Sequence, residues 1–169
     1  MRVFVPALLL LLLLTLPTAR AQAAAVTRGS FLNALWEHAG AVPYDATPVF
    51  SDVEREDPWA TAVGWAAAQG LVQGTGSGRF EPDRPITREE AALVLCRWAQ
   101  LQGREIRSTE GAGHKDAADL SPWSEGALPW AVETGLLEPV AGGRLDPSGS
   151  LEQREVDALF QRMAAGEGG

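Results

Sequence analysis

Two arginines in this 169-residue chain stand where a helix is expected to begin, each directly after a threonine. Arg28 follows Thr27, and 60 residues later Arg88 follows Thr87, with Glu90 two positions on. An arginine at a helix start lies beside backbone N–H groups that have no partner within the helix, which makes a small electropositive spot. Its planar guanidinium also matches the geometry of a carboxylate. A helix start of this kind is therefore suited to a carboxylate.

The threonine–arginine pair belongs to a segment that occurs three times, and the third copy is altered. The copies begin at Val26, Ile86 and Leu151, with offsets of 60 and 65 residues. In the third copy, Glu152 replaces the threonine and Gln153 replaces the arginine. The apolar helical face that follows is kept in all three copies, so a helix is predicted at each. All three copies therefore carry the pattern of the fold, whereas at most two carry the pattern of the binding site.

The complete unit, residues 50–100, predicts a helix, a loop and a second helix. Asp57 is placed as the N-cap of the first helix and Gly70 as its end. Thr87 and Glu90 form a Thr-x-x-Glu capping box for the second helix. Units of this kind stack on their neighbours, which predicts an all-α helical repeat bundle with long Gly/Pro loops.

The other two units are less complete. Residues 26–40 predict only the second helix of a unit, so this is a partial repeat. Residues 114–164 follow the whole plan in degenerate form. Pro129 falls inside the first helix of that unit and is expected to kink or break it, because proline removes a backbone hydrogen bond.

Residues 1–21 are typical of a secretory signal peptide. Arg2 precedes an apolar run over residues 3–16, and small residues suited to cleavage end at Ala21. The apolar run is shorter than the roughly 18–20 residues that span a bilayer. We therefore expect cleavage, secretion to the cell surface or cell wall, and no membrane span afterwards.

The charge balance narrows the class of partner. The chain has 14 basic and 22 acidic residues, and loss of Arg2 and Arg20 with the signal peptide would leave a net charge of −10. Such a surface argues against nucleic acid and anionic membrane as partners. Cys96 is the single cysteine, which excludes an intramolecular disulfide and metal sites built on cysteine. No motif predicts a catalytic site, a metal or a cofactor, so the chain is not expected to be an enzyme.

The spacing of the complete unit resembles the S-layer homology (SLH) repeat family. The residues 86–90, Ile-Thr-Arg-Glu-Glu, correspond to the family's Ile-Thr-Arg-Ala-Glu signature. The other matching residues are Phe50, Asp52, Val53, Trp59, Ala62, Ala66, Gly70, Leu71, Val72, Gly74, Gly78, Phe80 and Pro82. This resemblance implies units arranged around a pseudo-threefold axis, with binding grooves between neighbouring units.

The resemblance also implies a ligand, a secondary cell-wall polysaccharide that often carries pyruvate ketals. We expect its site to combine the anion-binding helix starts, a close backbone approach and tryptophans on which sugar rings can stack. Trp36 and Trp65 lie off the main apolar stripe of their helices, which leaves stacking and core packing open for both. The expected glycan-binding residues are Arg88, Arg28, Thr87, Glu90, Thr27, Gly74, Trp65 and Trp36.

Two functions remain open from the sequence. The first is a non-catalytic module that anchors the chain on wall glycan, as a stand-alone adaptor or structural protein of the wall. The second is a protein-interaction or assembly module that keeps the fold without binding glycan. The intact segment 86–90 favours the first function, and the degenerate unit 114–164 favours the second. Self-association is a further expectation, because a second chain could complete the partial repeat.

Overall fold

The computed structural model describes residues 25–45, 47–107, 113–124 and 126–166, so the expected signal peptide lies outside the described residues. These residues form an all-α fold, without strands, as predicted. The elements are α1 (Arg28–His38), α2 (Ala60–Ala68), α3 (Arg88–Leu101), the short 3₁₀ helices η1 (Ala117–Asp119) and η2 (Pro122–Ser124), α4 (Ala127–Glu133) and α5 (Gln153–Gly166).

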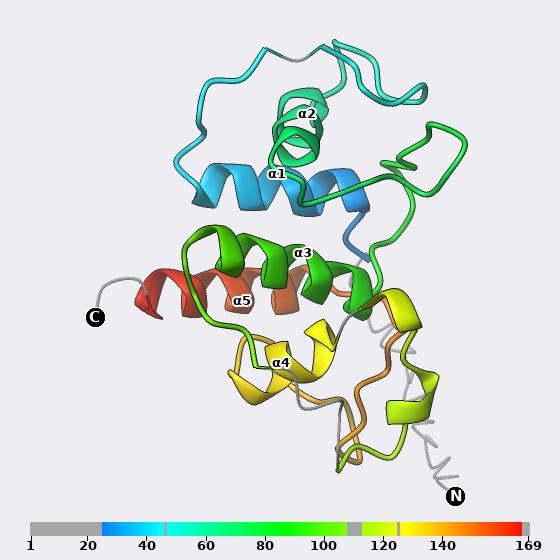
Figure 1. The fold of residues 1–169 in the computed structure, drawn as a ribbon, viewed down its shortest axis with the longest axis vertical. Helices are drawn as coiled ribbons and strands as arrows, with labels where there is room; N and C mark the ends of the chain where they lie inside the picture. The colour runs from blue at the N-terminus through cyan, green and yellow to red at the C-terminus, as the bar shows by residue number, and fades with distance from the viewer. Residues whose placement is uncertain (1–24, 46, 108–112, 125, 167–169) are drawn as a thin grey trace, which may run out of the picture.

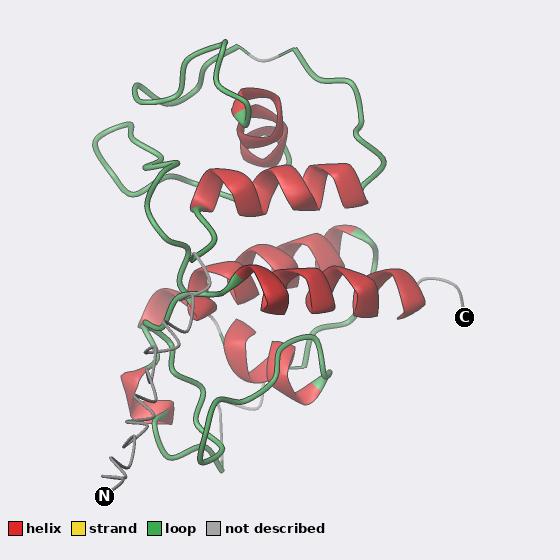
Figure 2. Ribbon diagram, turned by 180° about the vertical axis from the view of Figure 1, so that it is seen from behind, coloured by secondary structure: helices red, strands yellow, loops and turns green. Residues whose placement is uncertain are grey.

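The second helix of one unit packs on the first helix of the next. In this way α2 packs on α1, and α4 packs on α3 (Figure 1). The last helix, α5, contacts α1 from the other end of the described chain. Long loops cover the outer ends of the molecule beyond α2 and α4, as the view from behind also shows (Figure 2). In each of these contacts, a helix packs on a helix from another of the ranges 26–40, 50–100 and 114–164.

The start of α2 differs from the sequence prediction, whereas its end agrees. Trp59, not Asp57, is the N-cap residue, and the Asp57 carboxylate instead accepts a hydrogen bond from the Glu54 N–H. The prediction failed because an aspartate near a helix start can close a local turn as readily as it caps a helix. Gly70 ends the helix in the left-handed region with φ of 72°, as glycine does most easily.

The first helix of the last unit is divided, as Pro129 led us to expect, but the division lies ahead of the proline. The 3₁₀ helix η2 ends at Ser124 and α4 begins at Ala127, after Gly126 with φ of 73°. Pro129 then occupies the first turn of α4, where a backbone N–H has no partner within the helix and its absence costs little.

The residues just before α1, α3 and α5 are joined in a closed ring of backbone hydrogen bonds. Val26 N–H donates to the Leu151 carbonyl, Leu151 N–H to the Ile86 carbonyl, and Ile86 N–H to the Val26 carbonyl, over 2.9, 3.3 and 2.9 Å. All three side chains are buried. Because each residue both donates and accepts, these otherwise unpaired groups are satisfied within the ring.

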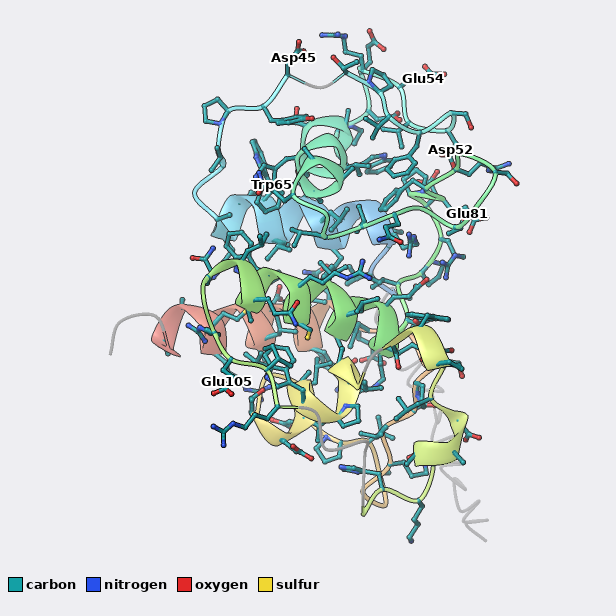
Figure 3. The ribbon with its side chains drawn as sticks, viewed as in Figure 1. Asp45, Asp52, Glu54, Trp65, Glu81 and Glu105 are labelled. Atoms are coloured by element: carbon teal, nitrogen blue, oxygen red, sulfur yellow. The ribbon has the colours of Figure 1, made fainter. Side chains whose placement is uncertain are left out.

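A carboxylate fixes the loop ahead of each of the later helix openings. Asp52 accepts the N–H groups of Phe80 and Glu81, both over 2.8 Å, and Asp116 holds the equivalent loop in the same way. Figure 3 shows Asp52 and Glu81 near each other on neighbouring loops beside α2. Burial raises the pKa of Asp52, but the hydrogen bonds from these N–H groups outweigh it and hold the pKa below its ordinary value.

The start of α1 has a glycine because an aromatic ring fills the space beside it. A Cβ atom at position 29 would lie 2.8 Å from both Cγ and Cδ2 of Trp59, which is closer than these atoms can approach. The ring of Trp59 therefore packs directly on the backbone of α1. This contact fixes the lead-in of α2 on the preceding unit.

We predict that Gly29→Ala destabilises the fold by about 1–3 kcal/mol, because the added methyl group forces Trp59 out of its place. The measurement is the urea midpoint of unfolding. Gly166→Ala is the control, since a Cβ atom there meets nothing within 4 Å. Equal midpoints for the two variants would contradict the packing described.

Candidate functional site

The threonines that precede α1 and α3 act as N-caps. The Thr27 Oγ1 accepts the Ser30 N–H over 3.2 Å, and the Thr87 Oγ1 accepts the Glu90 N–H over 3.3 Å. The Glu90 carboxylate accepts the Thr87 N–H in return, which completes the predicted capping box. The two helix starts are therefore fixed by their own sequence.

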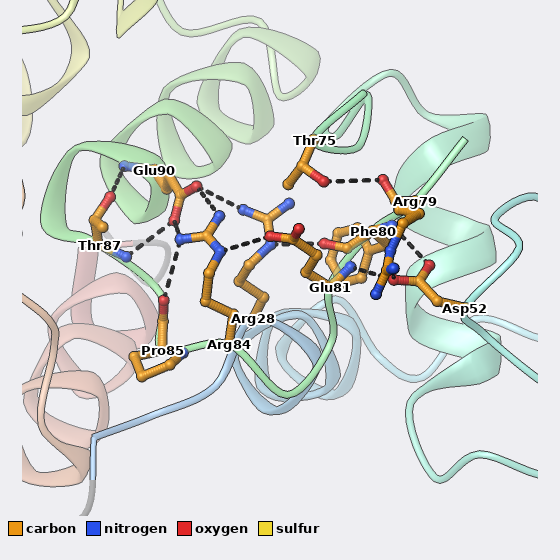
Figure 4. A network of polar contacts seen from close by, with 10 residues as sticks. All are labelled: Arg28, Asp52, Thr75, Arg79, Phe80, Glu81, Arg84, Pro85, Thr87 and Glu90. Carbon is orange, nitrogen blue, oxygen red and sulfur yellow. Dashed lines mark hydrogen bonds and ion pairs between the residues drawn. The ribbon is translucent and has the colours of Figure 1, made fainter. Parts of the chain in front are cut away.

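The opening arginines reach from these helix starts to the following unit. Arg28 donates from Nε to the Phe80 carbonyl and from Nη1 to Glu90, both over 2.9 Å. Its guanidinium carbon also lies 4.5 Å from the ring centre of Phe80, within the range of a cation–π contact. Phe80 lies in the loop of the complete unit and Glu90 in its second helix. Arg28 therefore connects both residues to α1, the helix that precedes this unit (Figure 4).

Arg88 makes the same contacts one unit later and is more deeply buried. It donates from Nε to the Leu145 carbonyl over 2.8 Å, from Nη1 to Glu155 over 2.9 Å and from Nη2 to the Glu138 carbonyl over 2.6 Å. The residue is 1% exposed. A ligand could reach its guanidinium only by displacing these protein groups.

The first backbone N–H groups of both helices are also occupied. Those of Arg28 and Gly29 donate to carbonyls of residues 84 and 82, and those of Arg88 and Glu89 donate to carbonyls of residues 149 and 147. The expectation that these N–H groups lack partners is therefore wrong. Loop carbonyls of the next unit fill the places that a carboxylate would take.

A groove of about 600 Å³ lies above the Arg28 contact, and we call it the first groove. Three cationic side chains line it, against one carboxylate, that of Glu90. The lining residues are Arg28, Leu71, Val72, Gln73, Gly74, Thr75, Arg84, Glu90, Leu93, Val94, Arg97 and Trp123. The first groove is therefore locally cationic on a chain whose formal net charge is −8.

Glu90 is held ionised by the cations around it. It receives Nη2 of Arg84 over 2.6 Å as well as Arg28, and Arg84 also donates from Nε to Glu81 over 2.9 Å (Figure 4). Burial raises the pKa of Glu90, but the hydrogen bonds from Arg84 and the Thr87 N–H, with the charges of the two arginines, hold the pKa below its ordinary value. Burial lowers the pKa of Arg28, which the charge of Glu90 opposes.

A second groove of about 520 Å³ occupies the equivalent place one unit later. Two arginines, Arg154 and Arg162, face two glutamates, Glu138 and Glu155. The remaining lining residues are Leu137, Pro139, Val140, Ala141 and Ala158. The charges in the second groove balance, in contrast to the first. The described residues include no cluster of three metal-ligating side chains, and none of the described helices is long and apolar enough to cross a membrane.

Residues 49–92 match the family model of the S-layer homology domain. The chain contains an S-layer homology domain. It is 30% identical over 123 residues to a cell surface protein of Thermoanaerobacter kivui, which covers 72% of the chain and 16% of that protein. It is 27% identical over 116 residues to the surface-layer 125 kDa protein of Lysinibacillus sphaericus, which covers 67% of the chain and 10% of that protein.

A cellulosome-anchoring protein of Acetivibrio thermocellus is 24% identical over 144 residues, covering 85% of the chain and 31% of that protein. These relatives of the S-layer homology domain are therefore surface and anchoring proteins by name. The chain spans less than a third of the length of each of them.

The domain brings together only part of the site expected from sequence. Arg28, Gly74 and Glu90 line the first groove. Gly74 is required there, because a Cβ atom would lie 2.5 Å from the Arg79 carbonyl oxygen. Thr27 and Thr87 serve as helix caps and line neither of the two grooves.

The two tryptophans expected to stack on sugar rings face elsewhere. Trp65 is 4% exposed and packs on Trp98, with ring centres 5.6 Å apart. Trp36 packs against the core and donates its indole N–H to the Val42 carbonyl. Both side chains lie off the main stripe of their helices, but residues outside their own helices cover that face as well.

Three groove residues were missed by sequence reasoning: Arg84, Arg97 and Trp123. Arg97 lies seven positions after Glu90, on the same helical face, so the helical period could have found it. Arg84 precedes the repeated segment by two residues. Trp123 comes from the third unit, and no signal in the sequence brings it to this groove.

We predict that Arg88→Ala costs about 3–5 kcal/mol of folding free energy, because it leaves buried carbonyls and the Glu155 carboxylate without their partner. The measurement is the free energy of unfolding in urea. Arg154→Ala is the control, since its side chain is 71% exposed and such surface ion pairs contribute at most about 1 kcal/mol. A small effect of both variants would contradict a structural role for Arg88.

We also predict that Glu90 makes the stability of the fold depend on pH. Its pKa is depressed in the folded state, so its contribution is complete above the ordinary value of 4.5 and is lost as the pH falls below it. The measurement compares urea midpoints at about pH 7 and about pH 3 for the wild type and Glu90→Gln. The variant should lose less stability on acidification, and an identical loss would contradict the prediction.

Proposed function

We propose that the chain is a non-catalytic anchoring module that holds an anionic secondary cell-wall polysaccharide in the first groove. The observation that carries the proposal is the excess of three arginines over one glutamate in that groove. An acidic chain can bind an anion only where cations are gathered locally. The first groove meets that condition, and the charge-balanced second groove does not.

Arg84 and Arg97 are the residues best suited to meet the ligand. The side chain of Arg84 is 36% exposed while it donates to Glu81 and Glu90, whereas that of Arg28 is 9% exposed. Arg97 donates to the Leu71 carbonyl from the wall of the groove. A guanidinium at the edge of a groove can direct its remaining N–H groups to a carboxylate while it keeps its protein partner. Pyruvate ketals would supply such carboxylates along a polysaccharide.

The relatives support anchoring as the role. One carries the name of a surface-layer protein, and another that of a cellulosome-anchoring protein. We extend the surface location of such proteins to this chain, with secretion directed by residues 1–21. Both walls of the first groove come from one chain, so binding as proposed does not require self-association.

The arrangement of the units is part of the same proposal. We take residues 26–40, 50–100 and 114–164 as three copies around a pseudo-threefold axis. The backbone ring that joins Val26, Ile86 and Leu151 supports it, because these residues hold equivalent places in the three copies. In this arrangement the lining of the first groove comes from all three copies, whereas that of the second groove comes from the last copy.

We predict that Arg97→Gln weakens retention on wall sacculi of Lysinibacillus sphaericus about tenfold, since one charge-assisted contact is lost. Arg162→Gln is the matched control: it is the equivalent residue in the second groove and donates to the equivalent carbonyl, that of Leu136. The control should leave retention unchanged.

Sacculi stripped chemically of their secondary polymer complete the experiment. Retention should fall to background on them. If retention persists without the polymer and in Arg97→Gln, glycan binding is wrong, and a protein-interaction module that keeps the fold becomes the better description.

A further inference from the structure

Two tryptophans hold equivalent positions in the sequence but have different surroundings. Trp59 precedes the first helix of the complete unit, and Trp123 precedes that of the last unit. Trp59 packs on the start of α1. Trp123 is 47% exposed, among the few large apolar side chains at the surface of the described residues, and it lines the first groove.

The residue at the second position of the receiving helix explains the difference. In α1 this residue is Gly29, which leaves room for the ring of Trp59. In α3 it is Glu89, which has a side chain where α1 has none. Its carboxylate binds Ser121, two residues before Trp123, and the ring of Trp123 is left 47% exposed in the first groove.

Glu89 also fixes the backbone that carries Trp123. Its buried carboxylate, in a residue 7% exposed, accepts the N–H and the hydroxyl of Ser121 over 3.1 and 2.9 Å. Ser124 closes the turn from the other side, since its N–H and hydroxyl both donate to the Ser121 carbonyl. Trp123 thus stands on a short turn held at both ends. A side chain fixed in this way loses little conformational freedom on binding.

We propose that Trp123 is a stacking platform for a sugar ring in the first groove, and that Glu89 is the residue that positions it. This inference rests on the proposed function. The groove then combines an aromatic face from the third unit with guanidinium groups from the first and second. A pyranose has an apolar face suited to an aromatic ring, and a ketal carboxylate on the same sugar suits a guanidinium. The ligand class is therefore an acidic sugar recognised by ring and charge together.

The experiment uses the methyl glycoside of a hexopyranose carrying a pyruvate ketal, with free pyruvate as a probe that has the charge but no ring. Protein labelled with fluorotryptophan gives one fluorine NMR signal for each tryptophan, and Trp123→Phe identifies the signal of Trp123. The glycoside should shift that signal and leave the signal of Trp36 in place, whereas pyruvate should shift neither.

Affinities of the variants test each residue. Trp123→Ala should weaken glycoside binding about tenfold, and Trp123→Phe should keep most of it, because a ring remains. Glu89→Ala should weaken binding and move the Trp123 signal even without ligand, whereas Glu89→Gln keeps hydrogen-bonding groups for Ser121 and should retain binding. Val49→Ala, at a residue that is 52% exposed and does not line the first groove, is the control.

The possible failures are distinguishable. If the wild type binds neither the glycoside nor sacculi, the proposed function fails and this inference fails with it. If the wild type binds but Trp123→Ala binds equally well, only the platform is wrong. If Trp123→Ala weakens binding but Glu89→Ala leaves both the affinity and the Trp123 signal unchanged, the platform holds and the positioning role of Glu89 is wrong.

Discussion

The fold depends on one repeated interaction, in which the opening of a helix holds the loop of the following unit. At both junctions the opening arginine donates to a loop carbonyl and to a glutamate, and the first two backbone N–H groups donate to two more loop carbonyls. A loop without regular structure has few other partners for its backbone groups. The same contacts therefore satisfy the helix start, fix the loop, and set the position of the groove wall that the loop forms.

Equivalent junctions nevertheless produce different grooves. The loop position of Arg84 corresponds to Gly149 one unit later, and that of Gln73 corresponds to Glu138. These two changes remove a cation from the second groove and add an anion to it, while the contacts of the opening arginine stay the same. The difference in charge between the grooves therefore involves two positions whose side chains the opening arginine does not contact. Binding can diverge between copies without disturbing the fold.

The features that could be predicted from the sequence are those that depend on residues close together along the chain. The capping box at Thr87 and Glu90 and the helix end at Gly70 depend on residues a few positions apart, so the pattern was sufficient. The role of Arg88 depends on Leu145 and Glu155, which are 57 and 67 positions away. Its position at a helix start was predicted correctly, but the groups opposite it were not. Trp65 and Trp123 show the same limit, since Trp98 of another helix covers the first, and the second lines a groove together with residues of the other two units.

The third copy of the repeated segment has Gln153 in place of the arginine, and this change can be related to the contacts that the arginine makes in the other two copies. From the sequence, the replacement of the arginine by Gln153 indicated a binding site that had been lost. The structure gives the opening arginines a different task, that of holding the next loop. In the described part of the chain, Gln153 donates to Asp157 of its own helix and reaches no loop of a following unit. In the other two copies the arginine at this position donates to a loop carbonyl and to a glutamate, whereas the described contact of Gln153 stays within its own helix. The third copy therefore lacks the contact between helix opening and loop that the other two copies share.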